Sequence, residues 1–183
     1  PYNPEYVDFV DYLDDLPPDV DMQIIYDIFE QALLAAEDLH SAGVTHGDLG
    51  PHNTLIRPRD NNLNLLDLGF SRFIGKEKVL GHEPGAIPEF VVGGFFDPEL
   101  DFGHCAEAYN DIYSLGKFFI HTLKKIKMEE PCDPMTEILI LPHLQVAGVD
   151  SKLIFLIFSM IDSNAERRPS LEECLRVVRS LRG

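Results

Sequence analysis

Residues 44–56, VTHGDLGPHNTLI, constrain the possible fold more than any other stretch of this sequence. A loop rich in Gly and Pro carries His46, Asp48 and Asn53 there, between two short apolar runs. Asp and Asn side chains commonly hydrogen-bond to the backbone of a loop, so this spacing alone has an ordinary structural explanation. The loop becomes a candidate functional segment only if other parts of the chain supply partners for it.

Helical patterns precede this loop, and a strand pattern follows it directly. Apolar residues recur at helical spacing in residues 4–13 and again in residues 22–41. Asp21 is placed to cap the second helix, and Gly43 is placed to end it. The runs TLIR and LNLLDL, separated by PRDNN, predict a β-hairpin after the loop.

The second half of the chain has a long irregular segment and then further helices. Residues 69–102 hold Gly and Pro at many points, and a loop of this length in a compact domain is usually functional. Helical patterns then cover residues 108–126, a stretch near 135–141, residues 151–162 and residues 170–181, where Ser170 and Glu173 form a capping-box pattern. This order of elements predicts one mainly α domain that covers residues 1–183.

Composition and charge exclude several functions. Hydrophobic residues make up 45% of the chain, yet no apolar run approaches the roughly 20 residues that cross a bilayer, so we expect no membrane partner. The net charge is −16, and twelve acidic residues precede the first basic residue, Arg57, which disfavours nucleic acid. The acidic balance is either an ordinary solvated surface or an attraction for basic partners. Three widely spaced cysteines fit a reducing compartment, so we expect a cytoplasmic location and leave a nuclear one open.

Five short motifs occur in the order found in one enzyme family. They are His46-Gly47-Asp48 with Asn53, Asp67-Leu68-Gly69, Asp97-Pro98-Glu99, the stretch beginning at Asp111, and Arg168-Pro169-Ser170. These motifs are similar to the H-R-D-L-x-x-x-N catalytic loop, the D-F-G, the A-P-E, the central helix and the late arginine of protein kinases. Each motif is weak alone, but five in order over almost the whole chain are specific. The chain therefore resembles the mainly α C-terminal lobe of a eukaryotic-type protein kinase, with HGD in place of HRD and DLG in place of DFG.

The resemblance implies a phosphoryl-transfer site on the loop and the hairpin. Transfer from ATP depends mostly on positioning and on neutralising charge. Asp48 is then the catalytic residue, which accepts the proton of the attacking hydroxyl. Asn53 and Asp67 are expected to bind Mg²⁺ and, through it, the phosphates of ATP, because hard cations prefer oxygen ligands. Leu55 is expected to form the apolar floor beneath the adenine, a role compatible with ordinary core packing.

The resemblance also implies structural roles around the site. His46 is expected to pack beneath the loop together with Leu68, and not to act as a base. Asp111, at the N-terminus of a helix, is expected to bind the backbone of the loop. Glu99 and Arg168 are expected to form a buried pair that ties the segment before residue 99 to the late helices.

Two glycines depart from the family pattern. Many protein kinases carry an arginine at the position of Gly47, where it pairs with a phosphorylated activation segment. Residues 72–98 contain no Ser, Thr or Tyr, so we expect regulation without phosphorylation of this segment. At the position of Gly50, Ser/Thr kinases carry a lysine that touches the transferred phosphate, and its threonine partner is missing here too.

The ATP-binding N-terminal lobe is the largest departure. The chain has no Gly-rich phosphate loop, no strand lysine and no partner glutamate ahead of the loop, so we expect this β lobe to be absent here and to lie upstream in the complete protein. We expect the complete protein to phosphorylate a protein hydroxyl with ATP and Mg²⁺, of Ser/Thr type more than Tyr, on a substrate that is possibly basic. This lobe alone should be inactive. Two alternatives stay open: a pseudokinase that acts as a binding scaffold, and a small-molecule kinase of the aminoglycoside or choline type.

Overall fold

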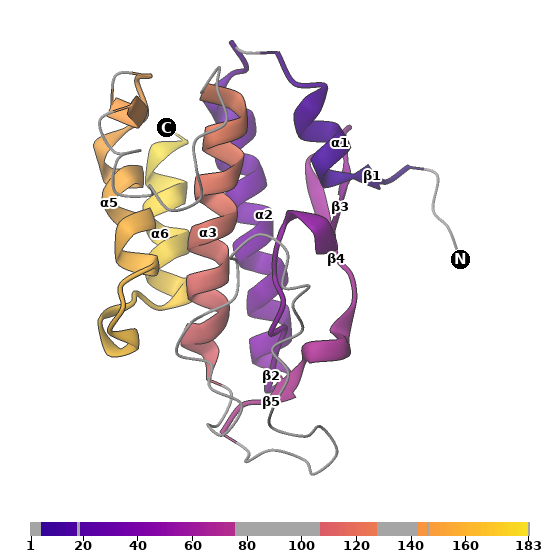
Figure 1. Ribbon diagram of the computed structural model, residues 1–183, viewed down its shortest axis with the longest axis vertical. Helices are drawn as coiled ribbons and strands as arrows, with labels where there is room; N and C mark the ends of the chain where they lie inside the picture. The colour runs from indigo at the N-terminus through magenta and orange to yellow at the C-terminus, as the bar shows by residue number, and fades with distance from the viewer. Residues whose placement is uncertain (1–4, 18, 76–106, 128–142, 146, 183) are drawn as a thin grey trace.

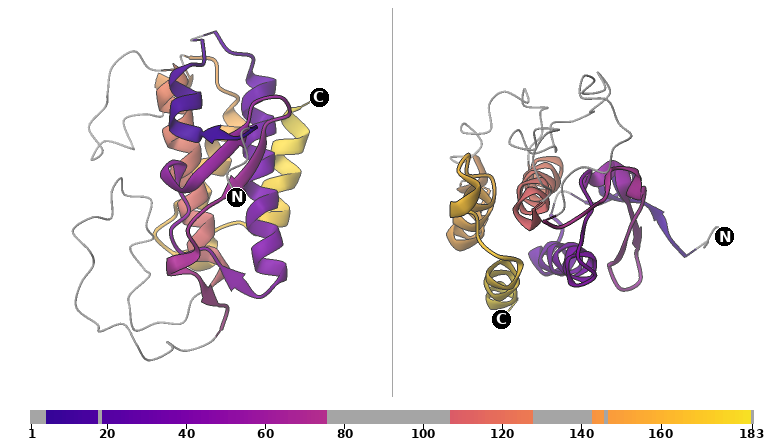
Figure 2. Two further views of the ribbon diagram at one scale, coloured as in Figure 1. Left: turned by 90° about the vertical axis from the view of Figure 1, so that its right-hand side faces the viewer. Right: turned by 90° about the horizontal axis from the view of Figure 1, so that it is seen from below.

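The computed structural model describes residues 5–17, 19–75, 107–127, 143–145 and 147–182. Within these residues the chain is mainly helical, as the sequence predicts. The helices α2 (Met22–Ser41), α3 (Ala108–Lys127), α5 (Ser151–Met160) and α6 (Leu171–Leu181) pack together. A small sheet lies on the other side of α2 from α6, and α1 (Phe9–Asp14) packs beside that sheet (Figures 1 and 2).

The expected hairpin is present after the loop. Strands β3 (Thr54–Arg57) and β4 (Asn62–Leu65) pair antiparallel, with Leu55 opposite Asn64, and β1 (Val7–Asp8) pairs with the other edge of β3. Thr54 and Ile56 are buried, whereas Leu55 is half-buried. This alternation follows from the period of two along a strand, so Leu55 lies on the opposite face from the core.

The start of the chain differs from its predicted helix over residues 4–13. Residues 7 and 8 form β1, and the helix begins only at Phe9. Asp8 is the reason, because its carboxylate accepts the N–H groups of Val10 at 2.8 Å and Asp11 at 3.3 Å and so caps α1. A residue that caps a helix has an extended backbone, which lets Val7 and Asp8 pair with β3.

The other helices agree closely with the sequence patterns. Asp21 caps α2 by accepting the Gln23 N–H at 3.0 Å, and Ser170 and Glu173 form the predicted capping box of α6. Helix α5 ends two residues before the predicted boundary at residue 162. The segments near 135–141 and over 76–102 lie outside the described residues. Before them, residues 68–70 form the short 3₁₀ helix η2, and β5 (Arg72–Phe73) pairs with β2 (Val44–Thr45).

Aromatic side chains join the helices in the core. Phe29 of α2 stacks on Phe119 of α3 with ring centroids 3.8 Å apart, and Phe9 of α1 stacks on Phe118 at 4.9 Å. Cys174 of α6 is buried in the same core, and burial raises the pKa of its thiol to about 12, so it stays protonated at neutral pH. The core thus fixes α2 and α3 side by side, and the candidate site lies where these two helices meet the loop.

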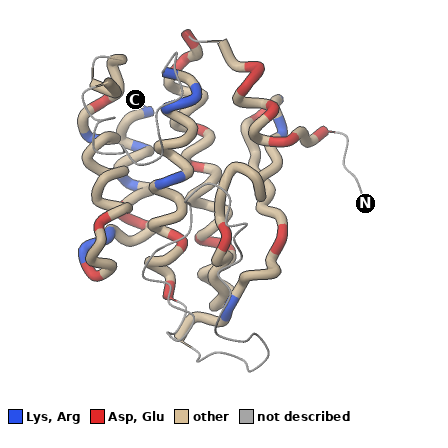
Figure 3. Tube along the Cα trace, in the orientation of Figure 1, with Lys and Arg blue, Asp and Glu red and all other residues tan. Residues whose placement is uncertain are grey.

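Charge is distributed unevenly over the described chain. Acidic residues are spread along the N-terminal half, while several basic residues lie on α3 and α6 and at the hairpin (Figure 3). None of the described helices is both long enough and apolar enough to cross a membrane.

Candidate functional site

The loop begins where α2 ends. Gly43 has a left-handed backbone, with φ of +75°, and its N–H donates to the carbonyl of His40 at 2.9 Å. Glycine adopts this helix-ending conformation without strain. The Ile74 N–H in turn donates to the Gly43 carbonyl at 2.9 Å. The chain that follows Asp67 is therefore paired with the chain that enters the loop.

Gly47 lies where a larger residue does not fit. Its φ is +79°, in the left-handed region that residues with a Cβ rarely adopt. A Cβ added to Gly47 would lie 2.5 Å from the carbonyl oxygen of Phe70, which is a backbone atom that no rotamer change can move aside. The close approach of the loop to the segment after Asp67 explains the glycine.

A buried carboxylate from α3 holds the start of the loop. Asp111 is fully buried in the first turn of α3. Its Oδ2 accepts the His46 N–H at 2.7 Å, and its Oδ1 accepts the Gly47 N–H at 3.0 Å. Nε2 of His40, from the last turn of α2, lies 2.8 Å from Oδ2. The expectation that Asp111 binds the backbone of the loop is confirmed, and these donors offset the cost of burying its charge.

His46 is a structural side chain, as expected. Its ring is fully buried, and burial lowers its pKa although Asp111 acts in the opposite direction, so the ring is neutral at physiological pH. Its Nδ1 accepts the Asp48 N–H at 3.3 Å, and its Nε2 donates to the Leu66 carbonyl at 3.0 Å. Both ring nitrogens are thus used within the protein, so His46 does not serve as a base.

The expectation that Leu68 packs with His46 is wrong. The Leu68 side chain is 55% exposed. Asp67 has a left-handed backbone, with φ of +56°, and η2 follows it directly. Leu68 follows this turn directly and lies at the surface of the described chain.

Asp48 and Asn53 are in direct contact. Nδ2 of Asn53 donates to the Asp48 carbonyl oxygen at 2.9 Å and to its Oδ2 at 2.8 Å. Both partners are acceptors, so Asn53 presents its NH₂ group to them and turns its own Oδ1 away from Asp48. Nε2 of His52 lies 3.5 Å from the same Oδ2, and the Asp48 side chain is 21% exposed. The loop therefore holds Asp48 in place while leaving it accessible.

Asp67 is tied to this pair through its neighbour Leu66. The Leu66 N–H donates to the Asn53 carbonyl at 2.8 Å, and the Leu66 carbonyl accepts from the His46 ring. Asp67 itself is exposed, and its Oδ1 accepts the Gly69 N–H at 3.0 Å. The backbone thus fixes the two expected magnesium ligands on adjoining segments.

The chemistry of Asn53 and Asp67 fits a magnesium ion shared with a phosphate. The described residues contain no group of three or more His, Cys, Asp or Glu side chains that could hold a metal. Mg²⁺, however, commonly takes only one or two protein oxygens and completes its shell with water and phosphate oxygens. The amide oxygen of Asn53 and the carboxylate of Asp67 are donors of this kind. Their assignment as magnesium ligands stays a prediction. The assignment of Leu55 to the apolar floor beneath the adenine also stays a prediction.

Two histidines near the site were not predicted from the sequence. His52 stands four residues after Asp48, and this spacing within one short loop was a usable signal. His40 carries no such signal, because its partner Asp111 is 71 residues away in the chain. Histidine is common in the last turn of a helix, where a charged ring interacts favourably with the helix dipole. Such a histidine needs no further role.

Comparison with known proteins decides the family. The protein kinase domain matches residues 5–178 of the chain. The chain belongs to the protein kinase family. It is 30% identical over 151 residues to serine/threonine-protein kinase D of Synechocystis sp., covering 81% of this chain and 29% of that protein.

Two eukaryotic kinases are similar to the same extent. Serine/threonine-protein kinase ppk34 of Schizosaccharomyces pombe is 31% identical over 157 residues, with 81% of this chain and 42% of that protein covered. Ovarian-specific serine/threonine-protein kinase Lok of Drosophila melanogaster is 30% identical over 160 residues, with 81% and 32% covered. This kinase chain therefore spans less than half the length of these relatives.

The late arginine of the kinase domain is fixed by backbone carbonyls. Nε of the buried Arg168 donates to the Asp162 carbonyl at 2.8 Å, and its Nη1 donates to the Tyr109 carbonyl at 3.2 Å. Its guanidinium also lies over the Tyr113 ring, 4.9 Å from the centroid. The motif with Glu99 lies outside the described residues, so the Glu99–Arg168 pair stays a prediction.

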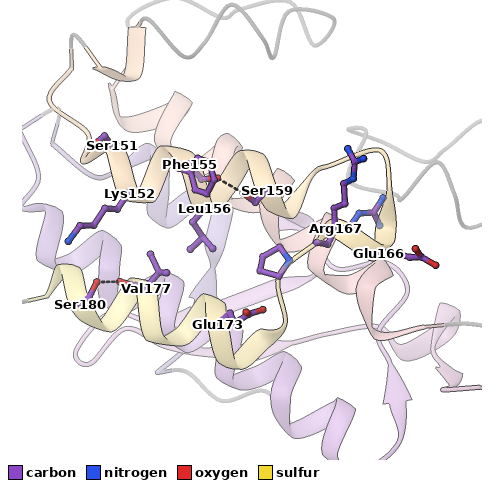
Figure 4. A pocket seen from close by; sticks show the side chains of 12 residues that line it. Ser151, Lys152, Phe155, Leu156, Ser159, Glu166, Arg167, Glu173, Val177 and Ser180 are labelled. Carbon is purple, nitrogen blue, oxygen red and sulfur yellow. Dashed lines mark hydrogen bonds between the residues drawn. The ribbon is translucent and has the colours of Figure 1, made fainter.

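A cavity of about 800 Å³ lies between α5 and α6 of the kinase domain (Figure 4). Leu156 and Val177 face each other across it, and Phe155, which is 75% exposed, stands on its rim. The described residues that line it come from positions 151–180, so it is separate from the loop that carries Asp48.

Proposed function

We propose that the complete protein phosphorylates Ser or Thr side chains of a protein substrate with ATP and Mg²⁺, and that residues 1–183 supply its catalytic loop and substrate lobe. The contact between Asp48 and Asn53, on a loop anchored by the buried Asp111, is the observation that carries this proposal. The names of the related serine/threonine kinases support a protein hydroxyl as the acceptor.

In this proposal Asp48 orients the acceptor hydroxyl and takes its proton. Among the described residues, the side-chain contacts to the Asp48 carboxylate, from Asn53 and His52, fall on Oδ2. Its Oδ1 is then the oxygen that receives the proton as the new O–P bond forms. General acid–base assistance of this kind typically contributes about 10²–10⁴ in rate.

Asn53 and Asp67 would hold Mg²⁺, which when bound neutralises the negative charge of the ATP phosphates. Leu55 would provide an apolar surface for the adenine on the face of β3 that points away from the core. These assignments rest on the oxygen donors of Asn53 and Asp67 and on the half-buried position of Leu55.

An N-terminal lobe from the same complete protein is proposed to cover the site. Three apolar side chains next to Asp67 are exposed in this chain: Leu66, Leu68 and Phe70. Exposed apolar residues gathered in one short segment commonly mark a surface that another part of a protein covers. The net charge of −16 supports a basic protein substrate as the acceptor.

The test is Asp48→Asn in the complete protein, with Asp38→Asn on the exposed surface of α2 as the control. We expect Asp48→Asn to lower phosphate transfer from ATP by about 10²–10⁴ while the melting temperature stays unchanged. Full transfer by a well-folded Asp48→Asn protein would exclude Asp48 as the catalytic residue.

A binding scaffold without kinase activity is the second candidate. The backbone of Gly50 is extended, with φ of −166°, a conformation that any residue adopts. The backbone therefore does not require a glycine in place of the kinase lysine at this position. The loss of that lysine is what a pseudokinase would show. A scaffold predicts no phosphate transfer by either the wild-type protein or Asp48→Asn.

A further inference from the structure

His52 lies beside Asp48 on the exposed side of the catalytic loop. Its Nε2 is 3.5 Å from Oδ2 of Asp48, and its side chain is 39% exposed. A carboxylate only accepts, so Nε2 carries the proton in this contact whether the ring is neutral or charged. The distance is at the long end of hydrogen bonding, so Asp48 holds the N–H only weakly. His52 therefore places a donor next to the proposed catalytic residue, and a small turn of the ring redirects it.

The backbone on both sides of His52 is fixed. Pro51 is buried and begins the short 3₁₀ helix η1 (Pro51–Asn53). The Gly50 carbonyl accepts the Asn53 N–H at 3.0 Å and the hydroxyl of the buried Thr54 at 2.9 Å. These bonds close the loop around His52. The ring therefore projects from a defined point of the loop, four residues after Asp48.

The loop has few other donors for the negative charge that the proposed reaction brings to it. The lysine that contacts the transferred phosphate in Ser/Thr kinases is replaced by Gly50. Asn53 directs its amide NH₂ to two oxygens of Asp48. Among the described residues, His52 is the other side-chain donor in contact with the Asp48 carboxylate. It is the donor on this loop that is both exposed and adjacent to the reacting oxygen.

The distances of a proton-transfer step bring the phosphate within reach of this donor. A general base lies about 2.6–3.2 Å from the hydroxyl oxygen, and that oxygen lies about 3–3.5 Å from the atom it attacks. The γ-phosphorus is then no more than about 7 Å from the Asp48 carboxylate. As the hydroxyl oxygen bonds to phosphorus, its proton passes to Oδ1 of Asp48 and the bridging oxygen leaves with ADP. His52 keeps its own proton throughout.

We propose that His52 is a catalytic residue of this chain, which donates its Nε2–H to the transferred phosphate in place of the lysine missing at Gly50. This inference rests on the proposed kinase function. It also gives that function a donor which the family pattern alone leaves absent, because the loop carries the donor at a different position.

Three variants of the complete protein separate the donor from packing. His52→Phe keeps a ring and removes the N–H. His52→Lys restores a donor at the same exposed position. Gly50→Lys combined with His52→Phe returns the donor to the family position, where the extended backbone accepts any residue. His143→Phe, at an exposed histidine outside the loop, is the control.

The first measurement is the transfer of labelled phosphate from ATP to histone, a basic protein. We expect His52→Phe to lower kcat by about 10–100-fold and to leave KM for ATP within about threefold, because a donor to developing charge acts mostly in the transition state. At least one of the two lysine variants should raise kcat about fivefold or more above that of His52→Phe. His143→Phe should match wild type.

The second measurement needs no activity. Nitrogen-15 spectra of the wild-type imidazoles are recorded with Mg²⁺ and either ADP or AMP-PNP, an ATP analogue that keeps a third phosphate and is not consumed. We expect the His52 signal to shift with AMP-PNP and to stay in place with ADP. This comparison also decides the question if His52→Phe does not fold.

The outcomes distinguish this inference from the proposed function. Wild-type kcat in a folded His52→Phe protein, two folded lysine variants no better than His52→Phe, or an equal His52 shift with both nucleotides would overturn the role of His52 and leave the kinase function standing. A shift specific to AMP-PNP in a protein that transfers no phosphate would support the contact and count against the kinase function alone. A complete protein that binds neither nucleotide would overturn both.

Discussion

At the scale of the residue, Gly47 shows how one position can satisfy two demands. Its left-handed backbone lets His46 and Gly47 present successive N–H groups to Asp111, and its missing Cβ leaves room for the Phe70 carbonyl. The lack of Ser, Thr and Tyr in residues 72–98 explains only why an arginine is not required at this position. The backbone geometry explains why a glycine suits this structure.

Replacing Gly47 with alanine should therefore cost more than replacing another left-handed glycine. Gly43→Ala meets nothing within 4 Å and carries only the conformational cost, about 1 kcal/mol. Gly47→Ala adds a clash with a backbone oxygen, so we expect a loss of about 3 kcal/mol. Urea unfolding of both variants measures this difference through the midpoint at constant m value. Equal losses would show that the loop and the segment after Asp67 move apart easily.

At the scale of the element, α2 and α6 are joined by a charged cluster. Glu30 of α2 is buried, its Oε1 lies 2.7 Å from Nε of Arg179, and its Oε2 contacts Arg182. Burial acts to raise the pKa of Glu30, but hydrogen bonds from Arg179 and Arg182 outweigh it and lower the pKa below its usual value. The ionised form is thus bound more tightly in the folded protein than in the unfolded chain.

Glu30→Gln should change how stability depends on pH. A carboxyl group with a lowered folded pKa contributes stability above its unfolded pKa of 4.5, and this contribution is lost as the pH falls through the folded pKa. We expect the variant to be about 1–2 kcal/mol less stable than wild type at pH 7, and the gap to narrow below about pH 4.5. Unfolding free energies from pH 3 to 7 measure this gap, with Glu37→Gln on the same helix as the control. A gap that stays constant with pH would mean that Glu30 is not ionised in the cluster.

The sequence predicted the elements that depend on local signals and missed those that depend on distant partners. Asp21, Gly43 and Ser170 mark helix ends through bonds within a few residues, so α2 and α6 were predicted closely. Strand β1 was missed because its pairing partner, β3, lies almost fifty residues away, although the cap at Asp8 that begins α1 is a local signal. The motif spacing pointed to the loop and to Asp111, while His40 and the exposure of Leu68 follow from three-dimensional packing that no local pattern encodes.

At the scale of the whole molecule, the described chain supplies one side of the proposed nucleotide site. Asp48, Asn53 and Asp67 lie on adjoining segments, and the apolar side chains of Leu66 and Leu68 beside them are exposed. In the proposed function, a second lobe closes over this surface and supplies the remaining contacts to ATP.

The 183-residue chain by itself should then bind Mg-ATP weakly and transfer no phosphate. The reason is that Asn53, Asp67 and Leu55 would contact only one side of the nucleotide. We expect no heat of binding in calorimetry at micromolar ATP, and a normal unfolding transition of the same sample serves as the folding control. Micromolar affinity for Mg-ATP would show that this chain needs no second lobe to form its nucleotide site.

The contact between Asp111 and the loop also has a consequence for the order of events during synthesis. Asp111 is 65 residues after His46 and 71 residues after His40 in the chain. At about 5–20 residues per second, a ribosome makes the loop roughly 3–13 s before it makes the aspartate that organises it. A growing chain thus carries Asp48, Asn53 and Asp67 for seconds before Asp111 can bind the N–H groups of His46 and Gly47. The backbone of His46 and Gly47 is anchored only after α3 has emerged and docked on α2, so a chain that ends before Asp111 lacks this anchor.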